Sequence, residues 1–448
     1  MKPFVHWCII LTVCTSLILT VGCITGSPGN TNATTVTSSP VSGTSSATLP
    51  AYENRTSFEK AVADANNQFG LDFYRTIRNN PDYQNRNLFF SPYSISTAFS
   101  VTYEGARGQT ASEIQGVFHF PQNDTVRRLG NADLYDDINS ANASYTLKTA
   151  NALWAEKTYP FLPEYVNVSD QYYHAKLTNL DFNGQPEASR ATINNWVEMQ
   201  TDNKIQDLLP PGSISPNATK LVITNAVYFK GTWQTQFNKS LTTDAQFTTG
   251  SGQGTTVPMM QIAGDPAKFR YMESDTFQAL ELPYTNAGGK PLSMLIVLPK
   301  GNDLTPVEEN LDLQQLAKIK NALSTRKVDV YIPRFTLEQT YSLPATLSGM
   351  GMPTAFGMST TGASPDFSGM DGTHNLYIGD AIHKSYVDVD EEGTEAAAAT
   401  AVTFNWGAVA TQETPVVFRA DHPFIFLIED TNSGNILFMG RVVNPSAM

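Results

Sequence analysis

The chain has 448 residues, of which 41% are hydrophobic, so it can bury a large core. Its formal net charge at pH 7 is −13, and such a surface repels phosphate groups. Composition therefore argues against nucleic acid or an anionic membrane surface as a partner.

The N-terminal residues 1–23 are typical of an export signal. A charged start at Lys2 is followed by an apolar run over residues 8–21 and then by Gly22-Cys23. This run is too short to span a bilayer comfortably. Cys23 resembles the acylated cysteine of lipoproteins, although the expected Leu stands one position too early, so plain cleavage stays open. The predicted location is extracellular: secreted, or lipid-anchored through Cys23 at the outer face of the cell membrane.

The three cysteines, Cys8, Cys14 and Cys23, all lie in this signal. The remainder of the chain therefore has neither a disulfide nor thiol chemistry. The six histidines lack metal-ligand spacing, and the chain contains no GxSxG, HExxH or P-loop motif. We expect no enzyme, no metal and no cofactor.

Residues 24–50 consist mostly of Ser, Thr, Gly, Pro, Asn and other small residues, a composition that cannot fold and predicts a linker. No second linker follows, so residues 51–448 are expected to form one large domain. Sequons for N-glycosylation, acceptable in an exported protein, occur at seven positions: Asn32, Asn54, Asn123, Asn142, Asn167, Asn217 and Asn238.

The periodicity of apolar residues predicts an α+β domain. An apolar stripe indicates a helix over residues 57–79, and a second helix-like stretch begins near Ala191 and ends at Pro210-Pro211. Later runs rich in β-branched and aromatic residues predict paired strands. These runs cover residues 220–229, 293–299, 327–335, 415–420, 423–430 and 435–443.

A connection of more than twenty residues, from Asp390 to Pro415, does not suit a static domain. Gly393 can act as a hinge. In an extended strand the small residues that follow it alternate between two faces, so they could slide between neighbouring strands. The run of alanines also suits a helix, because Ala is the best helix former. Composition alone leaves both interpretations open.

Residues 391–400, EEGTEAAAAT, resemble the proximal hinge of inhibitory serpins nearly residue for residue. Further blocks resemble serpin segments in the family's order, and the likeness covers residues 55–446, as in secreted prokaryotic members. It implies the serpin fold: about nine helices on three β-sheets, with an exposed reactive-centre loop near residues 391–417. The supporting blocks are residues 87–114, 192–209, 224–237, 365–370, 381–396 and 422–445.

The resemblance implies a monomeric suicide-substrate inhibitor of serine or cysteine proteases. The target cleaves the loop and forms a covalent acyl complex, and the freed strand inserts into the central sheet. The alternative is a non-inhibitory serpin that acts as a carrier or chaperone. Inhibition is favoured because the hinge residues Thr394, Ala396, Ala398 and Thr400 are all small.

The same resemblance assigns roles to individual residues. The loop hinge comprises Glu391, Glu392, Gly393, Thr394, Glu395, Ala396, Ala397, Ala398, Ala399 and Thr400. Control of sheet opening falls to Ser91, Ser94, Asn225, Trp233 and His383. From sequence alone, an ordinary buried histidine is the simpler interpretation of His383, and a core aromatic residue suits Trp233.

The cleaved bond lies among uncharged residues. Counting forward from Gly393 leads to Gly407-Ala408, whereas counting back from Phe418 leads to Val409-Ala410. No Lys or Arg occurs between Lys384 and Arg419, so a trypsin-like enzyme finds no suitable site. Elastase-, subtilisin- or chymotrypsin-like targets are expected. The candidates for the reactive bond are Trp406, Gly407, Ala408, Val409 and Ala410.

Overall fold

The computed structural model describes residues 52–139, 145–264, 267–286, 288–394 and 414–447. Within these ranges it contains ten α-helices, three 3₁₀ helices and sixteen strands, which confirms the α+β class. The predicted signal (residues 1–23) and linker (residues 24–50) lie outside the described residues. No helix among the described residues is both long and apolar enough to cross a bilayer.

Six of the ten helices among the described residues lie between residues 52 and 200. Their bounds are α1 Tyr52–Arg78, α2 Pro92–Gly105, α3 Gly108–Phe118, α4 Asp124–Asn139, α5 Pro163–Tyr173, α6 Pro186–Gln200, α7 Thr305–Glu309, α8 Leu313–Ala322, α9 Leu343–Met350 and α10 Ser368–Asp371. The short 3₁₀ helices are η1 Pro81–Tyr83, η2 Lys239–Leu241 and η3 Thr354–Phe356.

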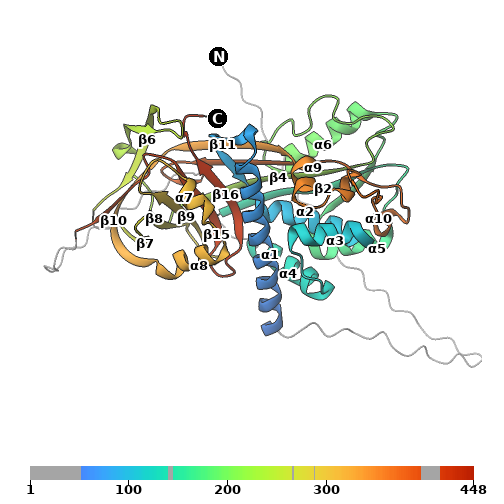
Figure 1. Ribbon diagram of the computed structural model, residues 1–448, viewed down its shortest axis with the longest axis horizontal. Coiled ribbons are helices and arrows are strands. Elements are labelled where there is room, and N and C mark those ends of the chain that lie inside the picture. Colours follow the sequence, from blue (N-terminus) through green and yellow to red (C-terminus); the bar gives the residue numbers. More distant parts are fainter. Residues whose placement is uncertain (1–51, 140–144, 265–266, 287, 395–413, 448) are drawn as a thin grey trace, which may run out of the picture. The chain divides into compact units, whose positions relative to one another are not determined.

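A six-stranded sheet carries the longest strands. Its order is β11 (Phe335–Ser342), β12 (Ile378–Val389), β13 (Gly393–Thr394), β4 (Leu221–Thr232), β2 (Tyr145–Glu156) and β3 (Lys176–Leu180). In Figure 1, α6 lies on one side of β2 and β4, and α2 and α3 lie on the other. This sheet is therefore covered by helices on both faces.

The remaining strands form a continuous ten-stranded sheet. Along the sheet they are β1 (Leu88–Phe90), β16 (Ile436–Val442), β15 (Phe424–Asp430), β9 (Leu292–Pro299), β8 (Phe277–Pro283), β7 (Lys268–Glu273), β10 (Ser324–Pro333), β6 (Gly254–Ile262) and β5 (Thr243–Thr248), with β14 (Val416–Arg419) also pairing with β10. Two of the three expected sheets are joined here, because β10 pairs with β7 near its start and with β6 near its end.

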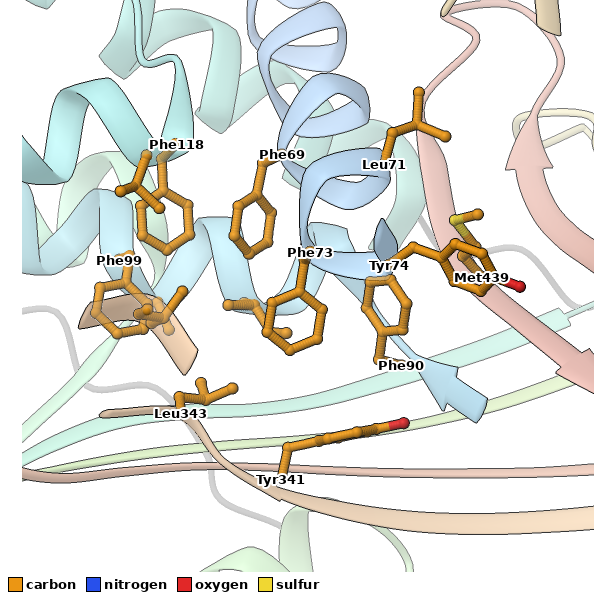
Figure 2. Packing of buried hydrophobic residues seen from close by; sticks show 14 of the residues in the cluster. Phe69, Leu71, Phe73, Tyr74, Phe90, Phe99, Phe118, Tyr341, Leu343 and Met439 are labelled. Carbon is orange, nitrogen blue, oxygen red and sulfur yellow. The ribbon is translucent and has the colours of Figure 1, made fainter. Parts of the chain in front are cut away.

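The apolar stripe predicted for the first helix is buried in α1. Phe69 stacks on Phe118 of α3, with ring centroids 4.3 Å apart, and Phe118 stacks on Phe99 of α2 at 4.8 Å. Figure 2 shows these rings together with Phe73, above Leu343 and Tyr341. The stripe thus attaches α1 to the helices that cover the six-stranded sheet.

The second predicted helix is wrong over its last part. The helix α6 ends at Gln200, and residues 201–209 are irregular. Asp202, Asn203 and Asp207 have φ values of 50°, 60° and 48°, in the left-handed region that short polar side chains tolerate and an α-helix excludes. Ile205, Leu208 and Leu209 are buried as the apolar spacing suggests, but the backbone that carries them is irregular and not helical.

Phe118→Ala should lower the free energy of unfolding by about 3–5 kcal/mol, because it leaves a cavity between two stacked rings. Thermal and urea unfolding followed by circular dichroism measure this loss. The control is Val166→Ala on α5, whose side chain is 39% exposed and should change stability little. Equal losses in the two variants would contradict the packing described.

Candidate functional site

In the six-stranded sheet β4 and β12 lie next to each other, and we call the line between them the seam. These strands pair in parallel from Leu221 opposite Ile378 to Tyr228 opposite Tyr386. Beyond that point β13 enters between them: Gly393 lies opposite Thr232 and Thr394 opposite Gly231, while Thr394 also lies opposite Val389 of β12. Gly393 and Thr394, near the start of the long connection, are therefore already strand residues at one end of the seam.

Two glycines allow this close approach. A Cβ atom on Gly393 would collide with the carbonyl oxygen of Gly231. A Cβ atom on Gly231 would lie 2.8 Å from ring atoms of both Phe229 and Tyr284. Because neither site has room for a side chain, glycine is needed at both for the hinge to enter the sheet.

Thr394 turns its side chain into the core, where its hydroxyl oxygen lies 2.9 Å from that of Tyr284. Burial raises the pKa of Tyr284, so this phenol stays neutral and can donate. The Tyr284 ring stacks on Trp233, with centroids 4.5 Å apart and planes at 14°. The Trp233 indole N–H donates to the Asp390 carbonyl oxygen at 3.0 Å, and its backbone N–H donates to Glu392 O at 2.9 Å. Trp233 thus lies directly against the hinge.

Charged groups fix the two residues before Gly393. Glu391 is fully buried and accepts from the Thr242 hydroxyl at 2.6 Å and from Arg334 Nη2. Burial alone would raise the pKa of Glu391, but these hydrogen bonds outweigh it and hold the pKa below its usual value. Glu392 pairs with Lys239, a contact that raises the pKa of Lys239. The hinge therefore starts from a charged and well-anchored turn.

A polar cluster lies across the seam on the face of the sheet that α2 covers, which we call the inner face. The structure brings together Ser91, which caps the start of α2, Ser94 of α2, Asn225 of β4 and His383 of β12, and adds Asn151 of β2. Asn225 Nδ2 donates to Ser94 O at 2.7 Å, and Ser94 Oγ donates to Asn151 Oδ1 at 3.1 Å. The Ser91 backbone N–H donates to His383 Nε2 at 3.1 Å. We call these five residues the inner-face cluster.

The hydrogen bonds determine the tautomer of His383. Since Nε2 accepts from Ser91, the proton resides on Nδ1, which donates to Asn225 Oδ1. Burial lowers the pKa of His383 to about 3, so the ring is neutral at physiological pH. The bond from His383 to Asn225 crosses the seam, so it must break whenever the two strands part.

The remaining predicted residues lie outside the described residues: Glu395–Thr400 of the hinge, the bond candidates Trp406–Ala410, and Cys23. Sequence reasoning missed Asn151 and Tyr284. Asn151 of β2 joins the cluster because it lies opposite Asn225 of β4. No local sequence pattern reveals this register. Within the described ranges no group of three or more His, Cys, Asp or Glu side chains is placed to hold a metal ion.

The free energy of unfolding should fall by about 1.4 kcal/mol per pH unit on acidification below pH 6.5 through His383 alone. The unfolded state takes up a proton there, whereas the native ring stays neutral down to about pH 3. Comparing pH profiles of thermal unfolding for wild type and His383→Gln measures this contribution. Parallel profiles would contradict it, and the exposed His374→Gln serves as control.

Comparisons with known proteins agree with this architecture. A family model described as "Serpin (serine protease inhibitor)" matches residues 64–445. An uncharacterized serpin-like protein of Thermococcus kodakarensis is 43% identical over 388 residues, which cover 86% of each chain. The human leukocyte elastase inhibitor is 41% identical over 395 residues, covering 86% of this chain and 99% of the inhibitor.

Solved structures extend the likeness to the fold. Uncleaved ovalbumin aligns with a TM-score of 0.75 at 30% identity, over 86% of this chain and all of that one (100%). Human thyroxine-binding globulin in complex with its hormone aligns with a TM-score of 0.76 at 29% identity, over 87% and 100% of the two chains. The predicted serpin fold is confirmed, and the chain belongs to the serpin family, which includes protease inhibitors such as the leukocyte elastase inhibitor.

Proposed function

We propose that this protein is a suicide-substrate inhibitor of serine or cysteine proteases. The protease nucleophile attacks a carbonyl carbon within residues 406–410, an acyl bond forms, and the peptide bond breaks to release a new amino terminus. The upstream part of the loop then enters the seam between β4 and β12. One observation carries the proposal: Gly393 and Thr394 already occupy the end of that seam.

The register of these two residues supports a particular path for an inserting strand. Because β13 is antiparallel to both β4 and β12, each later loop residue would pair with a residue one position earlier in each of these strands. Thr400, six residues after Thr394, would therefore lie opposite Asn225, six before Gly231, and opposite His383, six before Val389. Both partners belong to the inner-face cluster. The Thr400 hydroxyl can take up the hydrogen bonds that Asn225 and His383 lose when they separate.

The length of the seam suits the proposed bond. Phe404, ten residues after Thr394, would lie opposite Leu221, the first residue of β4. An extended strand over those ten steps covers about 33 Å. The candidates Trp406–Ala410 follow directly, so a protease attached there would be carried along the whole sheet.

Small inward-facing residues favour insertion over a carrier role. Thr394 faces the core, so Ala396, Ala398 and Thr400 would face it too, by strand alternation. Insertion exchanges one parallel pairing for two antiparallel ones, and each added backbone hydrogen bond contributes about 0.5–1.5 kcal/mol. The uncut form is then held by a barrier rather than by equilibrium. The second candidate, a non-inhibitory carrier, is supported by the likeness to thyroxine-binding globulin.

The uncharged bond region favours an elastase-, subtilisin- or chymotrypsin-like target, and the relative named leukocyte elastase inhibitor supports an elastase-like one. We further propose a monomer that meets its target outside the cell, secreted or held through a lipid on Cys23. The trap itself uses no cofactor.

Incubation with elastase, subtilisin or chymotrypsin should give a covalent complex that survives denaturing electrophoresis, whereas trypsin should give none. The melting temperature should also rise sharply after the loop is cut, because insertion completes the sheet. Clean cleavage by every protease, with no complex and an unchanged melting temperature, would favour the carrier.

Thr394→Arg should turn the inhibitor into a substrate. Thr394 is fully buried beside Tyr284, and an arginine there would carry its charge into the core. The stoichiometry of inhibition should rise at least tenfold while the loop is still cleaved. Thr243→Arg, at an exposed position of β5, is the matched control and should inhibit as wild type. Unchanged inhibition by Thr394→Arg would contradict insertion in this register.

A further inference from the structure

A different kind of contact lies across the opposite, outer face of the seam, which the segment after α6 covers. Tyr228 of β4 lies directly opposite Tyr386 of β12, and their ring centroids are 6.2 Å apart. Lys204 Nζ lies 5.9 Å from the centroid of each ring. One ammonium group therefore contacts an aromatic ring on each side of the seam, within cation–π range. We call Lys204, Tyr228 and Tyr386 the outer-face cluster.

Lys204 is held in place by the irregular segment after α6. Ile205, Leu208 and Leu209 of this segment are buried in an apolar cluster on the outer face of the sheet, with Trp154 and Val222. A second contact ties the segment to β12, since Lys384 Nζ donates to the Gln206 carbonyl oxygen at 3.0 Å. The segment thus contacts both strands of the seam, and Lys204 itself is half-buried.

We infer that Lys204 is a positioning residue that sets how readily the seam opens. This inference rests on the proposed insertion of the loop. Tyr228 lies three residues from Gly231, where the hinge already separates the strands. The tyrosine pair is therefore among the first contacts that an entering strand must break.

An inserted strand would disturb the contacts of Lys204 with Tyr228 and Tyr386. A new strand between β4 and β12 moves them apart by about 4.8 Å. Ring centroids that now lie 6.2 Å apart would then be about 11 Å apart. One ammonium group could stay within about 6 Å of both only midway between them, where Ala397 of the inserted strand would lie in the register given above. Lys204 consequently stabilises the closed seam over the opened one.

The chain contains a matched control at the other end of the same seam. Lys220 lies just before β4, and its Nζ is 5.2 Å from the ring of Tyr377, just before β12, and 5.3 Å from that of Tyr159. It also donates to Asn375 O at 3.0 Å. The chemistry is alike, but Lys220 is eleven residues along β4 from Gly231, so an entering strand reaches it last.

The experiment compares Lys204→Met and Lys220→Met, which keep most of the side-chain volume. The probe is a synthetic peptide with the sequence of residues 393–404, and its uptake by the intact protein is followed as the rise in melting temperature with time. Lys204→Met should take up the peptide about two- to fivefold faster than wild type, and Lys220→Met at the wild-type rate. Equal effects of the two substitutions, or no effect of Lys204→Met, would overturn the inference.

A second pair of variants separates ring contact from other effects. Tyr386→Phe keeps a ring for Lys204 and should behave as wild type, whereas Tyr386→Leu should behave as Lys204→Met. Acceleration by Phe as large as that by Leu would refute the cation–π assignment. If wild type takes up no peptide and its melting temperature does not rise on nicking, it is the proposed function that fails.

Discussion

The structure depends on the parallel pairing of β4 with β12. This pairing must hold a long sheet together, yet it is the one that the proposed insertion would exchange. Its two faces are secured separately, by the hydrogen bond between His383 and Asn225 inside and by Lys204 over Tyr228 and Tyr386 outside. All these contacts are side-chain contacts, and each can be broken without unfolding either strand.

Opening such a seam costs less free energy than its length suggests, because most of the hydrogen bonds that are lost would be replaced. Backbone groups that leave one strand find another, and the polar inner-face cluster can receive a hydroxyl where an apolar cluster would be left with a void. The hinge lowers the remaining cost, since Gly393 and Thr394 have already separated the strands at one end. In the proposed mechanism the contacts ahead of the hinge, rather than the sheet as a whole, would govern the barrier to insertion.

Much of this could be predicted from sequence. The α+β class followed from local patterns, and the family and the convergence of Ser91, Ser94, Asn225 and His383 followed from the resemblance to serpins. Asn151, Tyr284 and Lys204 could not be predicted, because their partners are fixed by the register between strands far apart in sequence. The helix expected over residues 201–209 was wrong for a related reason. The apolar residues of this segment are spaced as in a helix, but they are buried against the sheet from an irregular backbone.

The attachment of β14 makes the two sides of a cut unequal. Upstream of residues 406–410 the chain reaches the sheet at Gly393 and Thr394, whereas downstream it soon joins β10 through Val416–Arg419 and continues into the fully buried β15 and β16. After a break, the short carboxyl-terminal piece is thus interlocked with the larger fragment as an integral part of the ten-stranded sheet. A molecule cut at residues 406–410 would stay a single particle in two covalent pieces, which only a denaturant would part.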